Sequence, residues 1–167
     1  MNPASKYVSA SRENSPVHRF VADNGQGVAQ EHIEQATIAG RQVSVSNDVT
    51  DDEYTLIEEA IEATRPSQKA CFANSLKMWE YDNRFEYTEG YAVLSDLNVG
   101  GIEHAWCMID GEKLVDVTED SFDHYHGAII SDHDTLDRYT GTNITANGII
   151  GNHKNRYEFL RERDYYD

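Results

Sequence analysis

Basic residues are scarce in this chain, where 14 Lys and Arg stand against 30 Asp and Glu and give the 167 residues a formal net charge of −16. Binding to nucleic acid or to an anionic membrane surface requires clustered Lys and Arg, so the composition argues against both kinds of partner. A uniformly acidic surface stays hydrated in concentrated salt, but solubility alone explains it equally well. The composition therefore indicates either a halophilic source or an ordinary acidic protein.

Long apolar runs are also missing. No stretch approaches the roughly 20 apolar residues that a membrane-spanning helix requires. The first 16 residues lack the apolar core of a signal peptide, and only two cysteines are present. We therefore expect a cytoplasmic protein that is not secreted through a signal peptide and has no disulfide framework.

Enough apolar residues are present for a folded core, since 39% of the chain is hydrophobic and 10% is aromatic. The first 24 residues, rich in Ser, Asn and Pro, are typical of a flexible or partner-docked arm. A helical spacing of apolar residues follows at 28–39, and alternation around Val43 and Val45 indicates a short strand. We therefore predict an N-terminal extension over residues 1–48 and a compact domain over residues 49–167.

Helices precede strands in the predicted domain. Thr50 and Glu53 form a capping box, which predicts a helix over 51–64. The pattern further predicts a helix at 69–81, a strand through 85–94 interrupted near Gly90, a hairpin of 102–109 with 113–117, a helix at 132–139 capped by Ser131, and a terminal helix at 154–163. This order, without βαβ alternation, is typical of an α+β fold.

The two cysteines have different predicted surroundings. Cys71 falls in the first turn of the helix that begins near Lys69, where unpaired N–H groups and the helix dipole favour a thiolate. Cys107 lies within a strand, on the face opposite to His104, which is typical of a small core residue. Cys71 is therefore the candidate nucleophile, and a disulfide with Cys107 is not expected in the cytoplasm.

A cysteine nucleophile needs an imidazole to accept its proton and a third group to orient that ring. His104 on one hairpin strand and Asp116 on the next provide these residue types. A two-residue turn at Asp110-Gly111 would place Ala105 opposite Asp116, whereas a longer turn or a bulge would bring His104 and Asp116 onto one face. The hairpin register therefore decides whether the pair forms.

The order of these motifs resembles the transglutaminase-like branch of the papain-like cysteine enzymes. The segments that carry the resemblance are KACFAN at 69–74, EYTEGYAVL at 86–94, EHAW at 103–106 and LVDVT at 114–118. The resemblance covers residues 65–120, about a third of the chain. It implies a papain-like, transglutaminase-like α+β core in which a nucleophile helix packs on a small antiparallel sheet.

The resemblance also implies roles for individual residues. Cys71 corresponds to the nucleophile, His104 to its base and Asp116 to the group that orients the base. Gln68 corresponds to the upstream oxyanion donor, beside the backbone N–H of Cys71 itself. The sequence departs from the family at Val117, where a Pro is usual, and lacks the Trp or Gly-rich approach to the cysteine.

Two further residues near these motifs each have two interpretations. Asn74, one turn after Cys71, either hydrogen-bonds within the site or faces solvent. Trp106 either packs in the core against the cysteine helix, which is the expected arrangement, or forms a platform for substrate. The His- and Asp-rich segment over 123–137 matches no metal-site spacing, so we expect a solvated acidic loop and neither a metal nor an organic cofactor.

Two functions from different classes follow. The first is a cysteine-dependent hydrolase or acyl transferase that acts on an amide, isopeptide or ester bond of a peptide or protein through a Cys-His-Asp triad. The second is a non-catalytic structural or interaction protein, for instance a virion or assembly component, that uses a degenerate scaffold of the same fold. In the second hypothesis residues 1–48 dock onto a protein partner.

Overall fold

A computed structural model of the chain describes residues 2–96, 100–141 and 146–166. These residues form one seven-stranded antiparallel sheet with the order β1-β7-β4-β5-β6-β3-β2. The strands are β1 (Gln26–Val28), β2 (Ile33–Ile38), β3 (Arg41–Ser46), β4 (Phe85–Val93), β5 (Ile102–Ile109), β6 (Lys113–Asp116) and β7 (His124–Ile129). Together with the helices they confirm the predicted α+β class.

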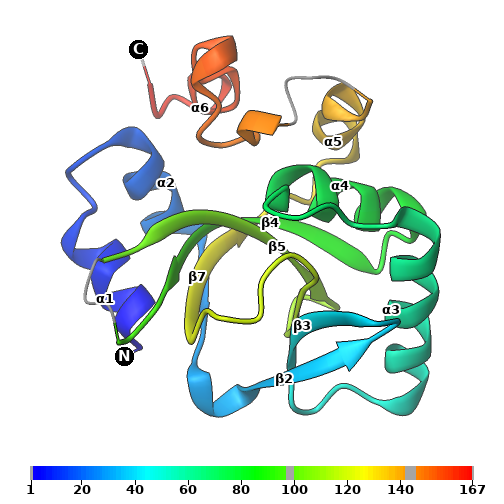
Figure 1. Cartoon of the computed structure of the whole chain (residues 1–167). Helices are drawn as coiled ribbons and strands as arrows, with labels where there is room; N and C mark the ends of the chain where they lie inside the picture. The colour runs from blue at the N-terminus through cyan, green and yellow to red at the C-terminus, as the bar shows by residue number, and fades with distance from the viewer. Residues whose placement is uncertain (1, 97–99, 142–145, 167) are drawn as a thin grey trace.

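The helices differ in length and lie largely on one side of the sheet (Figure 1). They are α1 (Pro3–Ala10), α2 (Pro16–Asn24), α3 (Asp51–Thr64), α4 (Cys71–Tyr81), α5 (His133–Tyr139) and α6 (Glu158–Glu162), with 3₁₀ turns η1 (Gln30–His32) and η3 (His153–Asn155). Within the described ranges no helix is long and apolar enough to cross a membrane.

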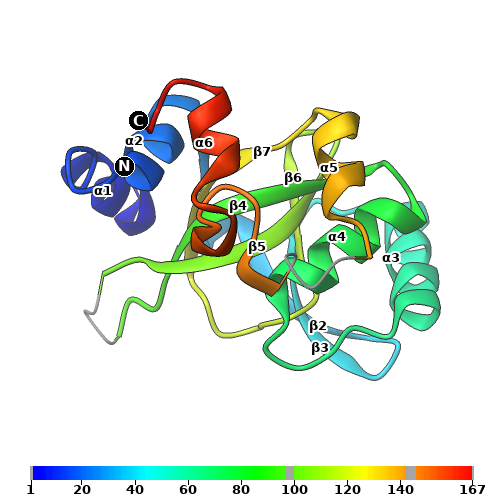
Figure 2. The same cartoon turned by 90° about the horizontal axis from the view of Figure 1, so that it is seen from above.

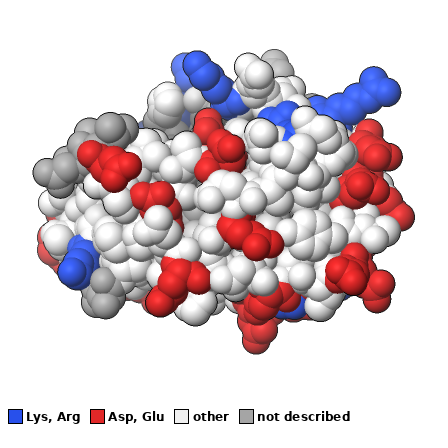
Figure 3. All heavy atoms as spheres, turned by 60° about the horizontal axis from the view of Figure 1, so that its bottom comes forward, with Lys and Arg blue, Asp and Glu red and all other residues white. Residues whose placement is uncertain are grey.

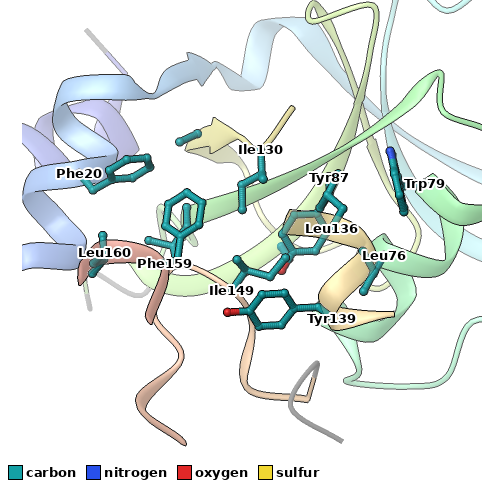
Figure 4. Packing of buried hydrophobic residues seen from close by; sticks show 13 residues of the cluster. Phe20, Leu76, Trp79, Tyr87, Ile130, Leu136, Tyr139, Ile149, Phe159 and Leu160 are labelled. Atoms are coloured by element: carbon teal, nitrogen blue, oxygen red, sulfur yellow. The ribbon is translucent and has the colours of Figure 1, made fainter. Parts of the chain in front are cut away.

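The core has parts on both faces of the sheet. On the helix-covered face, Tyr87 and Ala105 pack with side chains from α2, α4, α5 and α6, as Figure 4 shows for the labelled residues. Phe85 and Cys107 continue this face toward α3. The opposite face carries a separate cluster in which Trp106 meets residues of β6 and β7. The central strands β4 and β5 are therefore buried on both sides.

The helix predicted over 51–64 is confirmed with both bonds of its capping box. The Thr50 hydroxyl accepts the N–H of Glu53, and the Glu53 carboxylate accepts the N–H of Thr50. Three acidic residues in the first turn also interact favourably with the positive, N-terminal end of the helix dipole. The predicted helix at 69–81 is also present and begins at Cys71.

The prediction for residues 1–48 differs from the structure. The helix predicted at 28–39 is wrong, because Ile33–Ile38 pairs along its whole length with β3 as the strand β2. Ala39 and Gly40 both have positive φ and form the tight turn of this hairpin. The β3 strand then pairs with β6, so the chain on both sides of residue 49 belongs to one sheet.

Residues 2–24 are folded against the sheet. Asn2 and Ser15 cap α1 and α2 with their side chains, and a proline stands at the start of each helix. Val8 and Val21 are buried against Tyr91 of β4. The structure thus contains a packed N-terminal helix pair where the sequence predicted an arm outside the compact domain.

Three smaller expectations also differ from the structure. β4 runs through Gly90 without interruption, because Gly90 pairs with His104 on one side and Gly127 on the other. The α5 helix is capped by Asp132 rather than by Ser131. The terminal helix is the short α6, preceded by η3, in place of one helix over 154–163.

Candidate active site

The register of the β5–β6 hairpin places His104 and Asp116 on the same face. Ile109 pairs with Lys113 and Cys107 with Val115, so three residues rather than two form the loop. Positive φ values at Asp110 and Gly111 allow this turn. Because side chains alternate along a strand, residues 104, 106 and 116 point the same way. The longer turn, one of the two alternatives from the sequence, is the one found.

The His104 and Asp116 side chains form a buried hydrogen-bonded pair. His104 Nε2 lies 2.8 Å from Asp116 Oδ2, and the two residues are 4% and 0% exposed. The Asp116 carboxylate also accepts the Tyr125 hydroxyl at 2.7 Å on Oδ2 and the N–H groups of Thr118 and Glu119 on Oδ1. Asp116 is therefore held rigidly, and it fixes the orientation of the imidazole.

Cys71 is the first residue of α4 and is partly exposed. Its side chain lies near the His104 ring and is one of the groups that raise the pKa of that imidazole. Because His104 Nε2 is bonded to Asp116, Nδ1 is the ring nitrogen left for the thiol. The structure thus brings Cys71, His104 and Asp116 together in that order.

The start of α4 reaches His104 because β6 is short. Continuing the hairpin register would place Thr118 opposite His104, but β6 ends at Asp116. Thr118 instead accepts a hydrogen bond from Asn74, one turn after Cys71. The first turn of α4 therefore lies where the pairing of β5 with β6 ends.

The charge of Asp116 decides the protonation of His104. Burial opposes the charged imidazole, but the Asp116 charge, its hydrogen bond and the Cys71 thiol together raise the pKa of His104 to about 10. His104 is then an imidazolium at neutral pH. His104 therefore places a positive charge beside the Cys71 side chain.

Asn74 is buried and hydrogen-bonds within the site, which decides between its two interpretations. Its side-chain oxygen accepts the N–H of Ser67, and its amide group donates to the Ser67 carbonyl and to Thr118. These bonds join the loop before Cys71 to the turn that follows Asp116. Asn74 therefore positions the two halves of the site relative to each other.

Trp106 is a core residue, but its packing differs from the prediction. Its ring lies against Tyr125, 4.9 Å between centroids, and is roughly parallel to the His104 ring. This is the face of the sheet away from α4, so the expected packing against the cysteine helix is wrong. Together with Phe122, 4.8 Å from His104, these rings exclude water from the His104–Asp116 pair.

Gln68 is exposed and lines an open groove of about 980 Å³ beside the start of α4. The groove also has Lys69, Thr118 and Glu119 in its wall, so it runs between the loop before α4 and the turn after Asp116, but neither Cys71 nor His104 lines it.

The second cysteine is separate from the site. Cys107 is buried, its thiol donates to the Ser75 carbonyl, and burial raises its pKa. The predicted role as a small core residue is confirmed. Cys71 and Cys107 are both free thiols.

The His- and Asp-rich segment makes other contacts. His126 Nδ1 bonds the Ser5 hydroxyl, His124 Nδ1 accepts the N–H of Gln30, and Asp123 accepts the N–H of Ser95. In the part of the chain that the structure describes, no three His, Cys, Asp or Glu side chains are grouped to hold a metal ion.

Two buried residues near the site were missed from the sequence. Tyr125 donates to Asp116, and burial together with the Asp116 charge raises the pKa of Tyr125, so its hydroxyl stays a donor. Glu89 accepts the N–H groups of Ile149 and Ile150, and burial raises the pKa of Glu89 to about 7. The solvated acidic loop expected over 123–137 is wrong at Tyr125, which is buried in β7 and meets Asp116 through long-range pairing.

On the face that Figure 3 shows, acidic side chains are spread over the surface rather than gathered at one place.

Comparisons of the chain with protein-family models, with curated proteins and with solved structures find no match.

Proposed function

We propose that the protein is a cysteine-dependent hydrolase or acyl transferase acting on amide, isopeptide or ester bonds of peptides or proteins. The observation that carries this proposal is the buried, hydrogen-bonded pair of Asp116 and His104 beside the partly exposed Cys71 at a helix start. The same series fits the transglutaminase-like, papain-like core that the sequence motifs resemble. That family assignment is part of the proposal.

Each group has a defined role in the reaction. Cys71 Sγ, as the thiolate, attacks the carbonyl carbon, and the leaving amine or alcohol takes a proton from the His104 imidazolium. The result is a thioester on Cys71. Water, deprotonated by the now neutral His104, then releases the acid, whereas an amine in the same place gives acyl transfer.

Backbone N–H groups supply the electrostatic stabilisation. The first N–H groups of a helix have no intrahelical acceptor, and Ala70 at the N-cap has no side chain that accepts them. They face the place where the oxyanion develops when Cys71 attacks. Gln68, three residues upstream and exposed on the groove, is the candidate second donor.

The non-catalytic hypothesis loses its main support in this fold. It depended on residues 1–48 as a docking arm, and these residues are helices and strands of the packed domain. A rigidly oriented imidazole beside a partly exposed thiol is also more than a scaffold requires.

Acylation by an activated ester tests the proposal without knowledge of the substrate. We expect p-nitrophenyl acetate to acylate the folded wild type, with the acetyl group located on Cys71 by peptide mass spectrometry. The variant Cys71→Ser should acylate at least 100-fold more slowly, whereas Cys107→Ala should stay within about twofold. Equal rates in wild type and Cys71→Ser, or no acetyl group on Cys71, would contradict the proposal.

A further inference from the structure

A second cavity, of about 410 Å³, lies beside the N-terminal helices and the C-terminal segment. Figure 2 shows both ends of the chain on this side of the molecule, close to α2. The side chains in its wall that matter here are Tyr7, His18, Tyr91, Glu103, Tyr157 and Tyr166. Four tyrosine rings and one carboxylate thus line a single cavity of the size that small ligands occupy.

The rings form two groups, and within each group the rings contact one another. His18 stacks on Tyr91 with centroids 4.6 Å apart, and its Nε2 bonds the Tyr7 hydroxyl at 2.9 Å. Tyr157 stacks on Tyr166 with centroids 5.0 Å apart. Burial lowers the pKa of His18, so this ring is uncharged at neutral pH. The aromatic wall is therefore preorganised and neutral.

Glu103 has a negative charge and lacks a fixed partner. No Lys or Arg lines the cavity, and no hydrogen bond or ion pair to the Glu103 carboxylate occurs within residues 2–96, 100–141 and 146–166. The Glu103 side chain belongs to the exposed end of β5, and partial desolvation in the cavity raises its pKa while the charge of His153, also in the wall, lowers it. Apart from His153, the wall offers Glu103 no positive group, so a positively charged ligand would supply a paired counter-charge.

We propose that this cavity binds an organic ammonium cation of the lysine side-chain type. The ammonium group would pair with Glu103, and the alkyl chain would lie against the tyrosine rings, where cation–π attraction adds to apolar contact. The net charge of −16 raises the local concentration of cations around the protein. Binding here requires no reaction at Cys71.

The cavity lies directly beside the candidate active site. Glu103 precedes His104 in β5, and a smaller cavity is lined by Glu103, His104 and Phe72. Glu103 and His104 point to opposite faces of β5, so a ligand held at Glu103 lies on the α4 face, and the smaller cavity is what connects the two residues. An ammonium group in this place belongs to a basic substrate if the site is catalytic, and to a basic partner peptide if it is not.

Titration with n-butylammonium chloride tests the proposal on the intact chain. Tyrosine ring resonances would be followed by NMR, with sodium chloride at the same ionic strength and 1-butanol as the neutral isostere. We expect saturable shifts of the cavity tyrosines with butylammonium alone. Shifts of equal size with sodium chloride or with butanol would overturn the proposal.

Variants locate the site of binding. Glu103→Gln is expected to weaken butylammonium binding at least tenfold, whereas Glu58→Gln, which removes the same charge from the exposed side of α3, should change it less than twofold. Tyr166 is exposed, so Tyr166→Leu cannot disturb the core; it should weaken binding severalfold and Tyr166→Phe should not. Unchanged butylammonium binding in Glu103→Gln would overturn the proposal. Acylation of Cys71 by p-nitrophenyl acetate is measured separately and tests the catalytic proposal alone.

Discussion

At the scale of single residues, the site depends on how tightly Asp116 is held. Its carboxylate accepts hydrogen bonds from the imidazole, the Tyr125 hydroxyl and two backbone N–H groups, all within 3.2 Å. A fixed carboxylate keeps one tautomer and one orientation of His104, as the third member of a catalytic triad must. Mutations here therefore act on both stability and reactivity.

Tyr125→Phe removes one of these bonds and leaves the ring in place. Because the bond joins a buried hydroxyl to a charged group, we expect the free energy of unfolding to fall by about 1.5–3 kcal/mol in urea titrations. Tyr54→Phe is the matched control, since its hydroxyl bonds Glu34 at the surface, and should cost less than about 1 kcal/mol. Equal losses in the two variants would contradict the buried network.

The chemistry-bearing residues were predictable from residue type and order, whereas their supports were not. Cys71, His104 and Asp116 lie within motifs whose order carries the information. Tyr125 reaches Asp116 only because β7 pairs with β4. That pairing joins segments about 35 residues apart, and no local sequence pattern predicts it. The role of Asn74 likewise depends on the position of Thr118 at the end of β6.

At the scale of elements, α3 shows how a local pattern fixes structure. Its capping box lies within four consecutive residues and needs no tertiary contact. Glu53 then adds contacts outside the helix, because its carboxylate also accepts Lys113 Nζ at 2.8 Å from β6. The start of α3 is thereby tied to the hairpin that carries Asp116.

Thr50→Ala tests this cap. Loss of the hydroxyl leaves the N–H of Glu53 without its acceptor, so we expect a loss of about 1 kcal/mol in the free energy of unfolding. Thr50→Ser keeps the acceptor and should lose less than half of that. Chemical denaturation of both variants gives the comparison, and identical stabilities of Thr50→Ala and wild type would show that the cap contributes nothing.

The error at residues 28–39 has a physical origin at this scale. The spacing of apolar residues there suits a helix, but β2 is an edge strand with an uneven burial pattern, so alternation is weak. Gly40, which would also end a helix, instead forms a two-residue turn with Ala39. Pairing with β3 decides the structure, and sequence periodicity alone does not report it.

At the scale of the whole molecule, the N-terminal residues are part of the fold. The β1 strand lies at one end of the strand order and β2 at the other, and only residues 29–32 join them, so the sheet curls and brings its two edge strands near each other. A domain boundary near residue 49 followed from composition, because Ser, Asn and Pro are common in linkers. The same residues serve here as helix caps and first-turn prolines.

Deletion of residues 1–24 should therefore destabilise the domain. It removes a set of buried apolar side chains, namely Ala4, Val8, Phe20 and Val21. We expect at least about 3 kcal/mol of lost stability. Val21→Ala, with an expected loss of about 2 kcal/mol, keeps the effect measurable if the deletion variant does not fold. Exposed Lys6→Ala is the control, and thermal unfolding unchanged by the deletion would show that the helix pair is a separate arm.

The pH dependence of Cys71 alkylation by iodoacetamide tests the thiolate–imidazolium pair most directly. With a His104 pKa of about 10, the imidazolium persists from acid to about pH 10 and is lost only above it. For wild-type Cys71 we predict that the alkylation rate falls less than tenfold from pH 9 to pH 6. The alkylation rate of a free thiol with a pKa of about 8.5 falls roughly 200-fold over the same range. His104→Ala should follow the free thiol, and Asp116→Asn should lie between. A wild-type profile that matches the free thiol, or one unchanged in His104→Ala, would contradict the account.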